Sequence, residues 1–189
     1  MLPLLHISPD HAFILRPLES HHVFGAGFVL LGSLMTTESL AGGVWYRSRT
    51  RLLFFPATLI LLGWGMLAVT VIEPENRIAH FAMGLPMIVG GWSEAQHRLG
   101  NLSRVYADRF IIASLCFAAL ETALFHLDGP MMSGGFITHA SLAATGVAIG
   151  GLRYFQSQAP TSLARSLLIS GAVILIGIEL FIDAIFQTA

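Results

Sequence analysis

Long apolar stretches alternate with short polar ones along the chain. Six apolar stretches are each near the length of about 20 residues that a helix needs to cross a bilayer. They cover residues 23–46, 52–72, 78–93, 110–127, 131–152 and 163–186. The pattern predicts an all-α fold, a polytopic bundle of six transmembrane helices within residues 23–187. Residues 1–22 are expected to form an outer N-terminal segment that can lie along the membrane surface.

Arginine orients the predicted bundle, because basic residues in short loops stay on the cytoplasmic side. Eight arginines fall in or beside the first, third and fifth connections: Arg47, Arg49, Arg51, Arg98, Arg104, Arg109, Arg153 and Arg165. Only Arg16 and Arg77 fall on the opposite side. We therefore expect both termini outside, in a multi-pass protein of a cell inner membrane.

Composition agrees with a lipid environment and excludes several chemistries. Hydrophobic residues make up 54% of the 189 residues and charged residues 11%, too little polar surface for a soluble globule. The absence of lysine excludes Schiff-base chemistry. The single cysteine, Cys116, excludes a disulfide framework, and its apolar neighbours predict a small core residue. Motifs for phosphate, dinucleotide or nucleic-acid binding are absent, so we expect a non-enzymatic role without a nucleic-acid partner.

Ionisable side chains inside the predicted spans are candidates for function, because a charge near the bilayer centre is costly. One set lies in the outer half of the predicted membrane or at its outer edge: His22, His80, Glu121, His126, His139, Glu179 and Asp183. Glu38, Glu94 and His97 lie toward the inner side. Five of the six helices contribute to the outer set, so we expect these groups to gather in a common pocket.

The third span carries its candidate ligands on one face. At about 3.6 residues per turn, His80, Met83, Met87 and Glu94 fall on the same side of the helix. Thioether and imidazole groups suit Cu(I), whereas imidazole with carboxylate suits Cu(II), zinc or iron. These side chains along one side of the third span predict a route for a transition metal along this helix. Core packing is the alternative for the two methionines, since methionine fills irregular gaps.

Carboxylates add to the outer set. Glu179 and Asp183 are four residues apart on the sixth span, so they share a face and repel each other unless a proton, a cation or Arg77 intervenes. Glu121 lies at a similar depth with His126 just over one turn beyond it, which suits metal ligation or a proton relay. Further polar groups precede the first span: His6, Asp10, His11, Glu19, His21 and His22.

Two other patterns have competing explanations. His139 lies among Gly, Ala, Ser and Thr residues, which would let a flat macrocycle approach, and His80 matches it in depth as a second axial ligand of b-type haem. The same small residues are expected at a tight helix crossing. Glu94 and His97 form a Glu-x-x-His pair, half of a di-iron ligand set without its second copy.

The leading interpretation is a membrane protein that binds a transition metal, copper first, through outer His, Met and carboxylate groups, and passes it inward toward Glu38 and Glu94. The expected ligands are His22, His80, Met83, Met87, Glu121, His126, His139, Glu179 and Asp183.

Two alternatives stay open. One is an electron-transfer subunit that holds haem b between His80 and His139, with Glu121 or Glu179 accepting protons from a quinol. The other is a non-catalytic subunit of a larger membrane complex. The expected partners are therefore the lipid bilayer, a metal ion and, in the last case, other membrane subunits.

Overall fold

The computed structural model describes residues 17–72, 77–125, 134–158 and 162–186. Over these residues the chain forms six α-helices: α1 (Pro17–Ala41), α2 (Arg49–Ile72), α3 (Arg77–Arg98), α4 (Arg104–Phe125), α5 (Gly134–Gln158) and α6 (Leu163–Phe186). A short 3-10 helix, η2 (Gly42–Arg47), follows α1. The predicted all-α fold class is confirmed.

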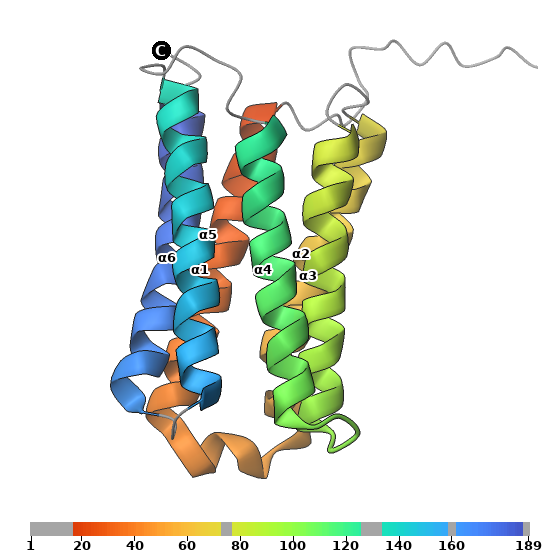
Figure 1. Ribbon diagram of the computed structural model, residues 1–189, viewed down its shortest axis with the longest axis vertical. Helices are drawn as coiled ribbons and strands as arrows, with labels where there is room; N and C mark the ends of the chain where they lie inside the picture. Colours follow the sequence, from red (N-terminus) through yellow and green to blue (C-terminus); the bar gives the residue numbers. More distant parts are fainter. Residues whose placement is uncertain (1–16, 73–76, 126–133, 159–161, 187–189) are drawn as a thin grey trace, which may run out of the picture.

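The helices form a closed ring in chain order (Figure 1). Each α-helix packs against the helices before and after it, and α6 packs against α1. The α2/α3 and α1/α6 contacts are the most extensive, and the seam between α1 and α2 is the least. Figure 1 shows η2 and the α3–α4 connection at the same end of the bundle. We call this the inner end and the opposite one the outer end.

Glycine lets two helix pairs approach closely. A Cβ atom added at Gly63 of α2 would lie 2.7 Å from the carbonyl oxygen of Gly84 in α3. A Cβ atom at Gly25 of α1 would lie 2.9 Å from the carbonyl oxygen of Gly177 in α6. Backbone contact of this kind holds helices together in lipid, where no hydrophobic effect acts between them. The α2/α3 and α1/α6 pairs are therefore the tight units of the ring.

Polarity is arranged with apolar groups outside and polar groups inside. Large apolar side chains are exposed on every α-helix, among them Val23, Leu61, Trp64, Phe81, Phe117, Val147 and Leu168. The buried polar residues are Glu38, Ser93, Glu94, Asp108, Thr122, Gln156, Ser170 and Glu179. Three helical segments are long and apolar enough to cross a membrane: His21–Arg47, Arg49–Val71 and Leu163–Ile182. These features indicate a membrane protein.

The helices continue beyond the apolar stretches that predicted them, mainly at the inner end. α3 ends at Arg98 instead of residue 93, α4 begins at Arg104 instead of residue 110, and α5 ends at Gln158 instead of residue 152. The added turns carry charged groups that are paired inside the bundle, so the helices extend past the apolar pattern. Residues 17–22 belong to α1.

The core position predicted for Cys116 is wrong, because this residue is exposed.

Two apolar clusters fill the centre of the ring. The larger one, which we call the apolar layer, comprises Leu31, Phe55, Ile149, Ile169 and Val173 from α1, α2, α5 and α6. The smaller cluster, toward the outer end, comprises Phe24, Met66 and Val69.

Candidate functional site

A cavity of about 210 Å³ lies in the outer half of the ring, and all six α-helices contribute to its wall. We call it the outer cavity. Much of its wall is apolar, and its candidate donors are thioethers and imidazoles. These donors are His21 of α1, Met66 of α2, His80, Met83 and Met87 of α3, and His139 of α5. The structure thus gathers six soft or borderline donors from four helices around one space.

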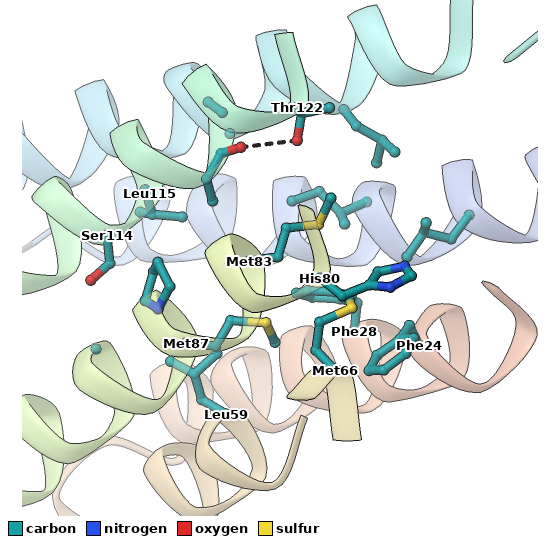
Figure 2. A pocket seen from close by; sticks show the side chains of 18 of the residues that line it. Phe24, Phe28, Leu59, Met66, His80, Met83, Met87, Ser114, Leu115 and Thr122 are labelled. Atoms are coloured by element: carbon teal, nitrogen blue, oxygen red, sulfur yellow. Dashed lines mark hydrogen bonds between the residues drawn. The ribbon is translucent and has the colours of Figure 1, made fainter. Parts of the chain in front are cut away.

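α3 positions three of these donors through its helical period. His80, Met83 and Met87 are three and four residues apart and therefore share a face. Figure 2 shows all three, and Met66 of α2, among the residues that line the outer cavity. Met83 also packs against the smaller apolar cluster, which contains Met66. The prediction that they share a face is confirmed. Glu94 lies farther along α3 and lines a second cavity at the inner end.

Met66 is a donor that the sequence analysis missed. It lies in α2, whose apolar residues surround the helix on all sides, so hydrophobic periodicity did not indicate which face was inward. In the structure Met66 is 9% exposed and packs in the smaller apolar cluster. Only its residue type could have indicated Met66 as a metal donor: it is a thioether on the helix that comes before the one carrying His80 and Met83.

His80 and His139 line the same cavity, as the haem alternative requires. His21, which was expected only to lead into the first span, lies on α1 and lines the cavity as well. The predicted ligand His22 instead has an exposed side chain. Its ring packs on Phe181 with the ring centroids 5.6 Å apart, on the outward side of the α1/α6 pair.

Glu179 is buried but lines neither of the two cavities described here. One carboxylate oxygen accepts hydrogen bonds from the hydroxyl groups of Ser141 and Thr145 in α5. The other oxygen is buried and has no hydrogen-bond partner among the described residues. Within the described part of the chain no ion pair joins Glu179 to Arg77. Glu179 therefore forms a polar contact between α5 and α6.

Three predicted ligands lie outside what the structure describes. His126 falls between α4 and α5, and the side chains of Glu121 and Asp183 are not described either. Among the described residues, no group of three or more His, Cys, Asp or Glu side chains is placed to hold a metal ion. The methionines that line the outer cavity are further soft donors in this part of the chain.

The inner end holds a second cavity of about 280 Å³, which we call the inner cavity. Its wall is much more polar than that of the outer cavity. The charged residues of its wall are Glu38, Glu94, Arg98, Arg104 and Arg153. Together with Asp108, which pairs with Arg104 and Arg153, they form what we call the inner charge network. The amide oxygen of Gln156, also in this wall, is buried with no hydrogen-bond partner among the described residues.

Arg98 is the centre of the inner charge network. Its guanidinium group contacts both oxygens of Glu38 at 2.9 Å, and its Nε donates to Glu94 at 2.7 Å. It also donates to the carbonyl oxygen of Leu52 at 2.9 Å and lies over the ring of Phe55 with 5.2 Å to the centroid. One side chain of α3 therefore ties together α1, α2 and α3.

The network continues toward α4 and α5. Arg153 donates to Glu94 at 3.2 Å and to Asp108 at 2.9 Å, and Arg104 donates to the other oxygen of Asp108 at 3.0 Å. Glu94 and Asp108 are each only 2% exposed. Three carboxylates thus alternate with three guanidinium groups, and the fixed charges balance. Such pairing is the usual condition for burying charge in a low dielectric.

From the sequence, these arginines were expected in or beside the connections, and Glu38 and Glu94 were expected to receive a metal from the outer site. In the structure both carboxylates are paired with arginine, and Tyr46 donates a further hydrogen bond to Glu38 at 2.6 Å. The Nδ1 atom of His97 lies 3.1 Å from the carbonyl oxygen of Leu102. Both oxygens of Glu94 are paired with arginine, one with Arg98 and the other with Arg153, so the carboxylate of the Glu-x-x-His pair is occupied by the inner charge network.

The chain matches no known protein family, no curated protein and no solved structure.

Proposed function

We propose that the protein binds a soft monovalent metal ion, Cu(I), in the outer cavity. The observation that carries the proposal is that three thioethers, Met66, Met83 and Met87, and the imidazole of His80 line one cavity. Thioether and imidazole groups bind Cu(I) in preference to harder divalent metal ions. The methionines come from two tightly packed helices, which favours a preformed site.

Charge supports a monovalent ion. Among the described lining residues of the outer cavity none is acidic, so the donors that we assign are neutral. The cost of taking an ion out of water rises with the square of its charge, and neutral donors in an apolar wall compensate poorly for two charges. The wall therefore favours Cu(I) over Cu(II) or zinc. His139 and His21 line the same cavity and are further candidate donors. The assignment of Glu121, His126 and Asp183 as metal ligands stays a prediction.

We further propose that all six helices cross a cell inner membrane, with the inner end cytoplasmic and both termini outside. The arginine asymmetry supports this orientation, because η2 and the α3–α4 connection lie at one end and arginines flank both. The exposed apolar side chains on every helix support lipid around the whole ring.

Anaerobic titration of the purified protein with Cu(I), in competition with a chromophoric Cu(I) chelator, tests the proposal. We expect Met66→Leu, Met83→Leu and His80→Ala each to lower the affinity by about tenfold or more, or about 1.4 kcal/mol each. Met35→Leu is the matched control, because Met35 lines the inner cavity. Equal affinities for the wild type, the Met66→Leu and Met83→Leu variants and the control would contradict the proposal.

A second candidate, haem b, is favoured by one observation: His80 and His139 line the same cavity. In this alternative the protein is an electron-transfer subunit with two axial imidazoles. A reduced-minus-oxidised absorption spectrum of the detergent-purified protein separates the candidates. Bands of b-type haem that vanish in both His80→Ala and His139→Ala would favour haem. A colourless protein that binds Cu(I) favours the metal site, and a protein that binds neither favours a non-catalytic subunit.

A further inference from the structure

The outer and inner cavities approach each other along the axis of the ring. Phe28, Leu59 and Ile176 line the outer cavity and pack against the apolar layer. Phe55 and Ile169 line the inner cavity and belong to that same layer. A single apolar layer therefore separates the two spaces.

The thickness of this layer follows from helix geometry. On α2, Phe55 borders the inner cavity and Leu59 the outer one, four residues or about 6 Å apart along the axis. On α6, Ile169 and Ile176 are seven residues or about 10 Å apart. A hydrocarbon barrier of this thickness excludes ions and water, and pores are gated by apolar constrictions of this kind.

The two sides of the layer differ in their chemistry. The outer cavity presents neutral thioethers and imidazoles, whereas the inner cavity presents charged groups and the open acceptor oxygen of Gln156. A metal ion bound on the outer side would therefore meet hydrophilic surroundings once past the layer. Asymmetry of this kind suits a path with a binding site at one end and a hydrated exit at the other.

The loosest seam of the ring is the place where such a path can open. Leu31 and Phe55 of the apolar layer belong to α1 and α2, the two helices at this seam. Arg98 holds the inner end of the seam through Glu38 of α1 and the Leu52 carbonyl of α2, and its guanidinium group lies over Phe55. The inner charge network thus contacts the layer directly and can act as its latch.

We infer that the two cavities are the two halves of one transport path through the ring, closed in this structure by the apolar layer. The identity of the ion, Cu(I), rests on the proposed function, whereas the path does not. Transport then consists of ligand exchange without a change in oxidation state: the ion leaves the outer thioethers, passes the opened layer and enters the inner cavity.

Thiol accessibility in membranes tests the path without any metal. Cys116 is the only native cysteine, so a Cys116→Ala variant contains no other thiol that could react with the reagent. Ser114→Cys places one thiol in the outer cavity and Ser39→Cys places one in the inner cavity. A charged, impermeant methanethiosulfonate reagent is added to spheroplasts and to inverted vesicles. We expect the two thiols to react from opposite faces only. Reaction of both thiols from the same face, or of neither from any face, would overturn the inference.

Widening the layer sharpens the test. In a Leu31→Ala/Val173→Ala double variant we expect the Ser114→Cys thiol to react from the second face as well, at least tenfold faster than without the two alanines. The matched control is Leu168→Ala/Leu175→Ala, whose side chains are exposed on α6. A double variant that reacts no faster than this control would contradict a path closed by the layer.

The thiol reactions, compared with Cu(I) binding in the titration described above, separate this inference from the proposed function. Opposite-face reaction of the thiols with no Cu(I) binding would leave the path standing and reject the metal. Cu(I) binding that depends on Met66 and Met83, with both thiols reacting from one face, would keep the metal site and reject the path.

Discussion

The outer and inner cavities show two different ways of placing polar atoms inside a helical bundle. The inner cavity buries full charges, and each carboxylate of its network is held by arginine. The outer cavity contains thioethers, which are weak acceptors and impose little cost when buried without a hydrogen bond. The charged groups at the inner end are paired with one another, whereas the thioethers at the outer end are neutral and take part in no ion pair.

Loss of Arg98 is expected to have the largest effect on the free energy of unfolding. Arg98→Leu leaves Glu38 and Glu94 buried without their main partner, and removing one partner of a buried ion pair costs about 3–5 kcal/mol. Unfolding of the purified protein in mixed detergent measures the change. Arg104→Leu is the control, because this side chain is 41% exposed and its loss should cost less than about 1 kcal/mol. A loss of less than about 1 kcal/mol in Arg98→Leu, no larger than in the control, would contradict a buried ion-pair network around this residue.

The next largest effect is expected on binding instead of folding. Met66→Leu/Met83→Leu removes two thioethers at nearly constant volume, so we expect the unfolding free energy to change by less than about 1.5 kcal/mol. The Cu(I) affinity should fall by about 100-fold, or about 2.8 kcal/mol, if the two losses add. The same titration and unfolding measurements apply. A variant that loses stability but keeps its Cu(I) affinity would reverse the contrast between the cavities.

A smaller effect is expected from pH. An imidazole must lose its proton to bind a metal, whereas a thioether has none to lose. The Cu(I) affinity should therefore fall as the pH is lowered, because protons compete with the metal for the imidazole. His80→Met is expected to flatten this dependence. If the dependence of the Cu(I) affinity on pH is the same in His80→Met as in the wild type, the ligand that takes up the proton is another residue, and His139 is the next one to substitute.

The smallest effect is expected at Glu179. Its carboxylate bonds Ser141 and Thr145 and lines neither of the two cavities, so Glu179→Gln should change the Cu(I) affinity by less than about threefold. Met35→Leu provides the same baseline in the titration. A loss of tenfold or more would return Glu179 to the metal site, as the sequence analysis predicted.

Much of the helical organisation could be predicted from the sequence, because burial in lipid imposes a length of apolar chain that is easy to detect. The third span shows the limit at its inner end, where α3 runs on to Arg98. An arginine is normally evidence for a loop, and only the positions of Glu38 and Glu94 in space explain why this one lies within the bundle.

The candidate site could be predicted in part. The shared face of His80, Met83 and Met87 follows from helical spacing alone, and the structure confirms it. Met66 was missed because an apolar helix has no polar face to orient it. Glu179 was assigned to the site from its depth and from its spacing to Asp183. In the structure one of its carboxylate oxygens accepts hydrogen bonds from hydroxyl groups on the neighbouring helix, and spacing along one helix carries no information about that neighbour.

X-ray absorption spectroscopy of the purified protein loaded with one equivalent of Cu(I) tests the central claim most directly. We expect a first coordination shell of sulfur with nitrogen, in which the sulfur contribution falls in the Met66→Leu/Met83→Leu variant and not in Met35→Leu. A shell of nitrogen and oxygen alone, or a spectrum that the double variant leaves unchanged, would contradict a thioether site in the outer cavity.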